Sequence, residues 1–167
     1  MATEFSLRHE FRASGPAAVF RAYFDETLAA EEDRRVDVVK REVLAVNDDG
    51  AVLHRRSRCV PRRQLPSFLR WGDAELSYTE ELTWRRAEDR IELDVRPSLF
   101  TTRIHGTTVY RLAALGPGRV ERTLDGIIEV SLPVIGRRIE RAIADDLQRS
   151  LEIAATCTQE WLDQHDV

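Results

Sequence analysis

Four polar side chains fall on the otherwise apolar faces of alternating segments, where they could take part in chemistry. They are His9, Glu80, Tyr110 and Arg122. Because a buried charge needs a partner, we expect these side chains to converge on one another or on the polar end of a ligand. In an aldol-type cyclisation, His9 or Glu80 could accept a proton while Arg122 stabilises an enolate. A strand bulge that shifts the register, or a satisfied structural ion pair, explains the same residues without catalysis, so no residue is assigned as catalytic.

Other kinds of catalytic site find less support in the sequence. No pair of histidines has a metal-ligand spacing such as H-x-x-x-H, and no G-x-S-x-G elbow is present. Cys59 and Cys157 lack the basic neighbour at a helix start that would lower a thiol pKa. We therefore expect no metal ion, no cofactor and no nucleophilic residue. The histidines occupy four separate segments, at His9, His54, His105 and His165.

The segment HRRSRCVPRRQLPSFLRW, residues 54–71, combines six arginines with a run of apolar residues. The chain as a whole carries 25 basic and 29 acidic residues, a net charge of −4, whereas nucleic-acid-binding domains usually have a basic excess. On the strand expected here, Arg56 and Arg58 point outward with His54, and a neighbouring acidic residue can pair with them. The aromatic residues follow the arginines rather than lying between them, so we expect no binding of nucleic acid.

Length and cysteine content favour one globular domain, spanning residues 1–167, in the cytoplasm. A chain of 167 residues can bury about two thirds of its unfolded surface in a single core. Two distant cysteines do not form a secreted disulfide framework, and they suit a reducing compartment. The charged N-terminus does not resemble a signal peptide, and no uncharged stretch approaches the ~18 residues that span a bilayer.

Hydrophobic periodicity predicts the order of the elements. Residues 5–11 alternate as a half-buried strand, and two short helices follow, the first after Pro16 and the second over 27–34. Six further segments alternate with a period of two, and a helix of about 30 residues follows from Pro133 onward with one apolar stripe. The six segments are 36–46, 51–60, 75–86, 91–95, 101–115 and 119–131.

This order excludes a parallel α/β fold, because short turns rather than crossover helices join the consecutive strands. The sheet must be antiparallel and curved, and its concave face is the only surface large enough to bury the stripe of the last helix. We therefore predict an α+β helix-grip fold, in which a curved antiparallel sheet of about seven strands wraps around the long C-terminal helix.

Three segments carry a resemblance to a known superfamily. They are FSLRHEFRASGPAAVFRAYFD near the N-terminus, LPSF after the third expected strand, and SLPVIGRRIERAI at the start of the last helix. With these, nearly the whole chain resembles the START/polyketide-cyclase superfamily, also called Bet v 1-like or SRPBCC, and it is most similar to a bacterial branch without an assigned function. The resemblance implies a cavity between sheet and helix, which different relatives use for lipids, sterols, polyketides or other apolar molecules.

From these observations we expect the protein to bind an apolar small molecule or lipid, as a carrier or transfer protein, in that cavity. Small residues on inward strand faces, such as Gly106, leave room for a ligand, although a bulge or a bend explains such a glycine equally well. The alternatives are a cyclase- or aromatase-like enzyme that acts in the same cavity, and a regulatory protein whose cavity is filled. The candidate cavity residues are His9, Tyr78, Glu80, Trp84, Gly106, Thr108, Tyr110, Arg122, Ile143 and Leu147.

The loop after the third strand is the candidate lid. Pro61 and Pro66 keep this segment out of the sheet, so its large apolar residues must cover something else. We expect them to close the cavity entrance or to plug the end of the core permanently. A lid that opens would allow transient, salt-sensitive contact with an anionic membrane. The lid residues are Leu65, Phe68, Leu69 and Trp71.

Overall fold

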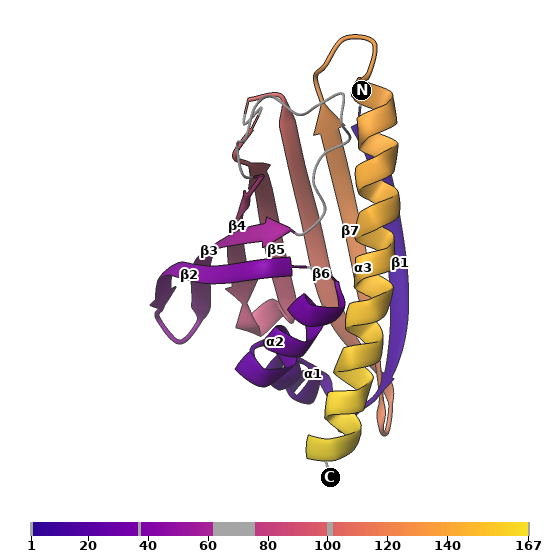
Figure 1. Ribbon diagram of the computed structural model, residues 1–167. Helices are drawn as coiled ribbons and strands as arrows, with labels where there is room; N and C mark the ends of the chain where they lie inside the picture. The colour runs from indigo at the N-terminus through magenta and orange to yellow at the C-terminus, as the bar shows by residue number, and fades with distance from the viewer. Residues whose placement is uncertain (1, 37, 62–75, 100–101, 167) are drawn as a thin grey trace.

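A computed structural model describes residues 2–36, 38–61, 76–99 and 102–166. Within these residues seven strands form one antiparallel sheet, and a long helix lies against its concave face (Figure 1), which confirms the predicted helix-grip architecture. The strands are β1 (Ala2–Arg12), β2 (Val38–Asp48), β3 (Val52–Pro61), β4 (Tyr78–Arg85), β5 (Arg90–Pro97), β6 (Ile104–Gly116) and β7 (Arg119–Val130). The helices are α1 (Pro16–Tyr23), α2 (Glu26–Arg35), the short 3-10 turn η2 (Arg86–Glu88) and α3 (Gly136–His165).

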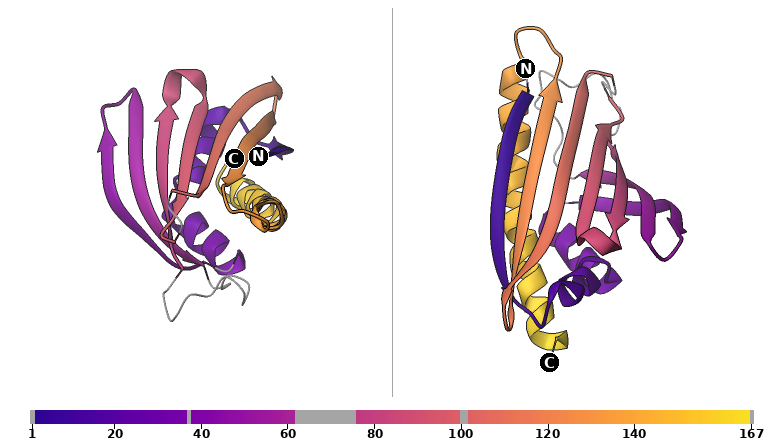
Figure 2. Two further views of the ribbon diagram at one scale, coloured as in Figure 1. Left: turned by 90° about the horizontal axis from the view of Figure 1, so that it is seen from above. Right: turned by 180° about the vertical axis from the view of Figure 1, so that it is seen from behind.

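The strand order is β1-β7-β6-β5-β4-β3-β2, so the first strand lies beside the last one. The strands β2 to β7 follow one another in sequence, and α1 and α2 carry the chain from β1 at one edge of the sheet to β2 at the other. Turn glycines allow the tight connections, because Gly50 and Gly118 adopt positive φ angles of 88° and 72°. Seen from above, the sheet bends around the side that α3 occupies (Figure 2).

The last helix has the predicted length of 30 residues but begins at Gly136, three residues after Pro133. Val134 has a φ of 69°, which is incompatible with a right-handed helix, so the chain turns once more before α3 starts. The first turns of α3 are fastened to two strands by a buried carboxylate. Glu140 accepts hydrogen bonds of 3.0 Å from the hydroxyl of Thr3 and of 3.0 Å from the backbone N–H of Val130.

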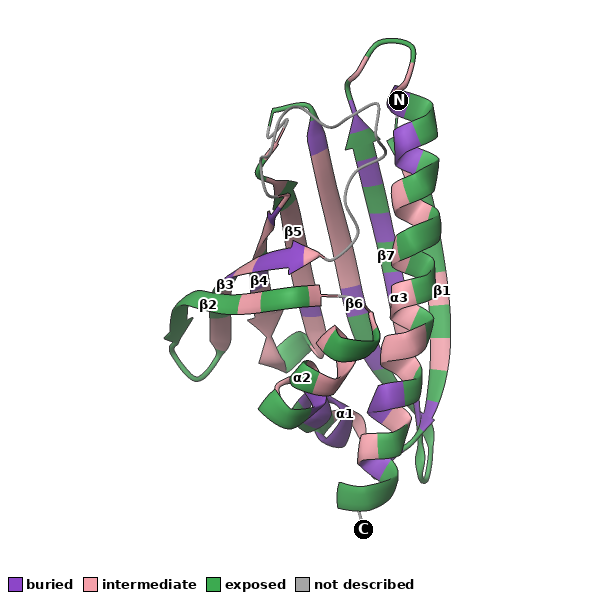
Figure 3. Ribbon diagram, in the orientation of Figure 1, coloured by how far each residue is buried: buried purple, intermediate pink, exposed green. Residues whose placement is uncertain are grey.

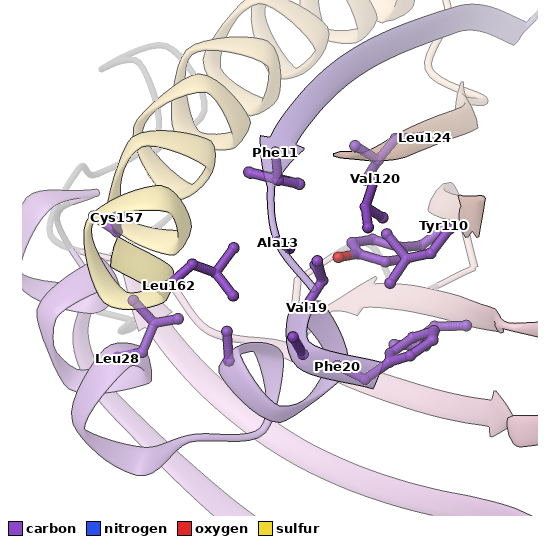
Figure 4. Packing of buried hydrophobic residues seen from close by; sticks show 14 of the residues in the cluster. Phe11, Ala13, Val19, Phe20, Leu28, Tyr110, Val120, Leu124, Cys157 and Leu162 are labelled. Atoms are coloured by element: carbon purple, nitrogen blue, oxygen red, sulfur yellow. The ribbon is translucent and has the colours of Figure 1, made fainter. Parts of the chain in front are cut away.

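The hydrophobic core consists of two clusters, one at each end of α3. The larger cluster lies where α1 and the C-terminal part of α3 meet the sheet, and Figure 4 shows Phe11, Tyr110 and Leu162 within it. The smaller cluster lies at the N-terminal end of α3 and contains Ile104, Ile128, Val130 and Ile139. The half-buried side chains of Phe5, Ile143 and Leu147 pack against the smaller cluster. The apolar stripe of α3 therefore faces the sheet, as the sequence predicts.

The surface arginines on β3 also behave as predicted. Arg56 forms an ion pair of 2.8 Å with Glu81 on β4, and Arg58 donates a hydrogen bond of 3.3 Å to the hydroxyl of Ser77. Arg56 thus has the predicted acidic partner on the neighbouring strand, whereas the partner of Arg58 is a buried serine just before β4. In the described part of the chain, no helix is long and apolar enough to cross a bilayer.

The contact between Gly136 and β7 gives a test of how α3 is fastened. A Cβ atom on Gly136 would lie 2.7 Å from the backbone carbonyl oxygen of Val130, too close without a shift of the backbone. We expect Gly136→Ala to lower the free energy of unfolding by about 1–3 kcal/mol, as overpacking does elsewhere. Gly106→Ala is the matched control, because its Cβ would lie 3.8 Å from the Cβ of Val95, an ordinary contact. Equal denaturation midpoints for the two variants would contradict this account of the helix start.

Candidate functional site

Strand pairing places all eight candidate residues of the sheet on one face. Residues paired across an antiparallel ladder share a face, and so do residues two apart along a strand. His9 pairs with Arg122, Thr108 with Gly126, and Tyr110 with Leu124. The same parity links Gly106 and Thr108 on β6 with Tyr78, Glu80 and Trp84 on β4, through their partners on β5. This is the concave face, which α3 covers.

His9 and Arg122 are in direct contact beneath α3. Nη2 of Arg122 donates a hydrogen bond of 3.0 Å to Nδ1 of His9 and a second bond of 3.3 Å to the backbone carbonyl of Leu151. Nε2 of His9 lies 3.2 Å from a carboxylate oxygen of Glu152. The three side chains come from β1, β7 and α3, so the meeting of these elements places them together.

These contacts determine the protonation state and the tautomer of His9. Burial lowers the pKa of His9 below its ordinary value, and the positive charge of Arg122 lowers it further, while Glu152 opposes both effects. Because a guanidinium can only donate, Nδ1 of His9 must be the acceptor, and the proton of the neutral ring is on Nε2. Both ring nitrogens therefore face groups of the protein itself, which leaves neither free to act as a base on a bound molecule.

Glu80 lies in a separate ion-pair cluster. Arg41 on β2 contacts Glu80 at 2.8 Å and Asp33 on α2 at 2.9 Å, so one guanidinium joins two carboxylates. The cluster ties α2 to the inner face of β2 and β4. Glu80 thus occupies the structural ion pair that was one of its two interpretations. The sequence analysis named neither Arg41 nor Asp33, because no local pattern shows that α2 crosses this edge of the sheet.

Glu32 is the carboxylate that the sequence analysis missed. It lies on α2, partly exposed, and removal from water raises its pKa to about 7, although the nearby charges of Arg122 and Arg41 act in the opposite direction. The hydroxyl of Thr158 on α3 also interacts with it. A polar helix such as α2, with four acidic residues among ten, gives no indication of which of its carboxylates faces the core.

Two of the candidate residues belong to the aromatic core. Tyr110 is buried, with its ring centroid 5.3 Å from that of Tyr23 and 6.3 Å from that of Phe20. Trp84 packs at 4.8 Å against Phe20 and at 4.8 Å against Phe24. These rings fill the part of the concave face next to α1, so the half-buried residues of this face lie toward the N-terminal end of α3.

Burial falls off between the two core clusters. Along the inner face of β6, Ile104 and Tyr110 are buried, but Gly106 and Thr108 between them are only half-buried, as the middle of β6 in Figure 3 shows. Burial decreases in the same way along β5, where Ile91 is buried but Leu93 and Val95, the next two inward residues, are half-buried. We call the region between the clusters the half-buried zone. Its half-buried inward residues are Tyr78, Leu93, Val95, Gly106, Thr108, Ile143, Leu147 and Leu151.

Gly126 does not contribute room to this zone. Its inner side is occupied by the ring of Phe5 from β1, because a Cβ atom on Gly126 would lie 2.2 Å from the ring carbon Cζ. Gly106 has no such neighbour.

The four candidate lid residues, Leu65, Phe68, Leu69 and Trp71, lie outside the described residues. Within the described part of the chain, no group of three or more histidine, cysteine or acidic residues is placed to hold a metal ion.

A family model described as "Protein of unknown function (DUF2505)" matches residues 6–162. The chain belongs to the DUF2505 family. A search of the curated proteins finds no match. The matched residues include most of β1, the other six strands and nearly all of α3, and therefore also His9, Glu32 and Arg122.

Solved structures place this DUF2505 protein in the START/Bet v 1-like fold. The Zhui aromatase/cyclase from Streptomyces sp. R1128 superposes with a TM-score of 0.70 at 10% identity, over 98% of this chain and 95% of that one. A START superfamily protein from Mycobacterium smegmatis gives 0.62 at 16% identity, over 96% and 97%. Norcoclaurine synthase from Thalictrum flavum, in complex with dopamine and hydroxybenzaldehyde, gives 0.62 at 11% identity, over 100% and 90%. At these identities the likeness shows the fold alone.

The raised pKa of Glu32 predicts how stability varies with pH. Its pKa is higher in the folded protein than in the unfolded chain, so its stabilising contribution is complete below the unfolded value of 4.5 and is lost as pH rises through about 7. Glu32→Gln removes this loss. We expect the melting temperature of the variant, relative to wild type, to rise between pH 5 and pH 8. If the difference in melting temperature between the variant and wild type stays constant from pH 5 to pH 8, Glu32 ionises like an exposed carboxyl group.

Proposed function

We propose that this DUF2505 protein binds an apolar small molecule or lipid between the concave face of the sheet and the middle of α3. The observation that carries the proposal is the half-buried zone between the two core clusters. There, apolar side chains from β5 and α3 face inward and still remain accessible, beside Gly106 and Thr108 of β6. A ligand that covered them would gain about 25 cal/mol for each Å² of apolar surface removed from water.

The way in which α3 is held supports this proposal. Glu140 fastens one end of the helix to β1 and β7, and Cys157 and Leu162 pack into the larger cluster at the other end. Between these contacts the inward side chains are small or only half-buried, as Gly106 and Thr108 are. A helix fixed at both ends cannot move onto β6 without breaking one of its end contacts, and near its midpoint Leu151 and Glu152 contact β7 and β1 rather than β6.

The binding proposal is tested by filling the zone from Gly106. We expect Gly106→Phe to weaken binding of a neutral apolar dye such as Nile red by at least about tenfold, because the ring would occupy ligand space. Thr107→Phe is the matched control, since Thr107 is the next residue of β6 and faces the opposite side of the sheet. The measurement is a fluorescence titration of both folded variants. Equal affinity in the two variants would place the ligand elsewhere.

An enzyme of the cyclase or aromatase kind is the second candidate, and Glu32 is the observation that favours it. A carboxyl group with a pKa of about 7 can both accept and donate a proton near neutral pH, and Arg122 nearby could stabilise a developing oxyanion. Glu32 takes the place that the sequence analysis gave to His9 and Glu80, because those two side chains are occupied by partners within the protein.

Catalysis can be separated from binding with two matched variants. If the protein transforms a ligand that co-purifies with it, Glu32→Gln should stop the conversion while the ligand stays bound. Glu80→Gln serves as the comparison, because Glu80 is held by Arg41 and should not transfer protons. Mass spectrometry of the ligand before and after incubation is the measurement. An unchanged ligand in wild type, or equal conversion in both variants, would leave binding as the function.

A further inference from the structure

Arg122 is a buried cation without a buried anion. Its side chain is in the interior, with 3% of the residue exposed. The groups that it contacts by hydrogen bonds are the neutral ring of His9, the backbone carbonyl of Leu151 and the hydroxyl of Tyr110, and no described carboxylate forms an ion pair with it. Arg41 on the same face is different, because it contacts two carboxylates within 3 Å. Burying a guanidinium without a counter-charge is costly unless something else supplies that charge.

The guanidinium of Arg122 also has an unpaired hydrogen-bond donor. Its Nε is buried and has no hydrogen-bond partner among the described residues. The rings of Phe11 and Tyr110 flank the group, at 5.0 Å and 5.6 Å from its central carbon, and hold it in a fixed orientation. Its charge, its unpaired Nε donor and its rigid position together suit the binding of an oxyanion, which accepts hydrogen bonds from a guanidinium.

Apolar groups lie next to this cation. Leu124 follows Arg122 on the inner face of β7 and pairs with Tyr110 on β6, and Thr108 and Gly106 lie two and four residues beyond Tyr110 along β6. From the helix side, Leu151 contacts Arg122 through its carbonyl group, and Leu147 is one turn further toward the half-buried zone. A molecule with one charged end at Arg122 would therefore extend its apolar part directly into the zone that the proposed function assigns to the ligand.

We propose that the ligand is an amphiphile with an anionic head group, and that its oxyanion pairs with Arg122 while its apolar chain lies along β6 under the middle of α3. This inference rests on the proposed function and specifies its substrate class. Fatty acids and other long-chain carboxylates have this chemistry, and so do sulfonates and phosphates on an apolar chain.

Glu32 makes this pairing sensitive to pH. When its carboxyl group is protonated it can donate a hydrogen bond to the oxyanion, and when ionised it repels the oxyanion and competes for Arg122. The charged and titratable groups that act on Glu32 come from five elements: Arg122 on β7, Arg41 on β2, Asp33 on α2, Tyr110 on β6 and Cys157 on α3, with the hydroxyl of Thr158 on α3 as a further partner. The anion should thus bind more weakly as pH rises through about 7.

The first experiment compares head groups on the wild-type protein, so it does not depend on any variant folding. Decanoate, decane-1-sulfonate and 1-decanol, which share a chain length, are each used to displace Nile red at pH 6.5. We expect both anions to bind at least about tenfold more tightly than the alcohol, the value of one charge-assisted hydrogen bond. Equal or tighter binding of decanol would overturn the inference while leaving the proposed function intact. If Nile red itself does not bind, the proposed function fails.

Two arginine variants then locate the head group. Arg122→Gln should remove the preference for anions over decanol while keeping the affinity for decanol. Arg55→Gln is the matched control, because Arg55 is an inward-facing arginine on β3 whose guanidinium lies 5.3 Å from the ring centroid of Phe24. It should retain the preference. Loss of the preference in Arg55→Gln and its survival in Arg122→Gln would overturn the assignment to Arg122.

The role of Glu32 is tested with decane-1-sulfonate, whose own charge does not change over the pH range used. Between pH 6.5 and 8.5 we expect the affinity of wild type for the sulfonate to fall about fivefold, and that of Glu32→Gln to stay constant. This range lies above the titration of His9, whose pKa is lowered. Parallel pH profiles for the two proteins would exclude Glu32 as the group that controls binding.

Discussion

The structure depends on how one long helix meets a curved sheet. A helix of 30 residues is about 45 Å long, and it contacts the concave face most closely near its two ends. Glu140 makes the contact at one end through Thr3 and Val130, and the residues around Leu162 make it at the other. A sheet that bends away between these contacts leaves side chains half-buried in the middle. The same geometry thus joins the elements of the fold and produces the half-buried zone between the two core clusters.

The polar groups inside this frame differ in how well they are satisfied. Arg41, Asp33 and Glu80 satisfy one another and join α2 to the sheet. His9 is neutral near pH 7 and lies between Arg122 and Glu152. Arg122 lacks an anion, and Glu32 has a raised pKa beside it. The buried Nε of Arg122 has no hydrogen-bond partner among the described residues, which makes Arg122 a candidate for a role in function.

The solved structures that share this fold are only 8–18% identical to the DUF2505 chain. They include an aromatase/cyclase and a norcoclaurine synthase, so the fold accommodates both chemistry and binding. The function of each protein must therefore depend on the side chains inside the shared fold. In our proposal these side chains are Arg122 and Glu32, together with the half-buried zone beside Gly106.

The sequence by itself determined the order of the elements, the antiparallel sheet and the burial of the helical stripe, because hydrophobic periodicity is a local property that each segment carries independently. It also placed His9, Glu80 and Arg122 on one face, because strand alternation fixes the side on which a residue points. Only the tertiary structure decided which charges meet. Glu80 on β4 pairs with Arg41 on β2, which also contacts Asp33 on α2, and the charge of Arg122 on β7 lowers the pKa of Glu32 on α2, although these residues are distant in sequence. No local period encodes such a contact, since it depends on how the short helices pack across the open end of the sheet.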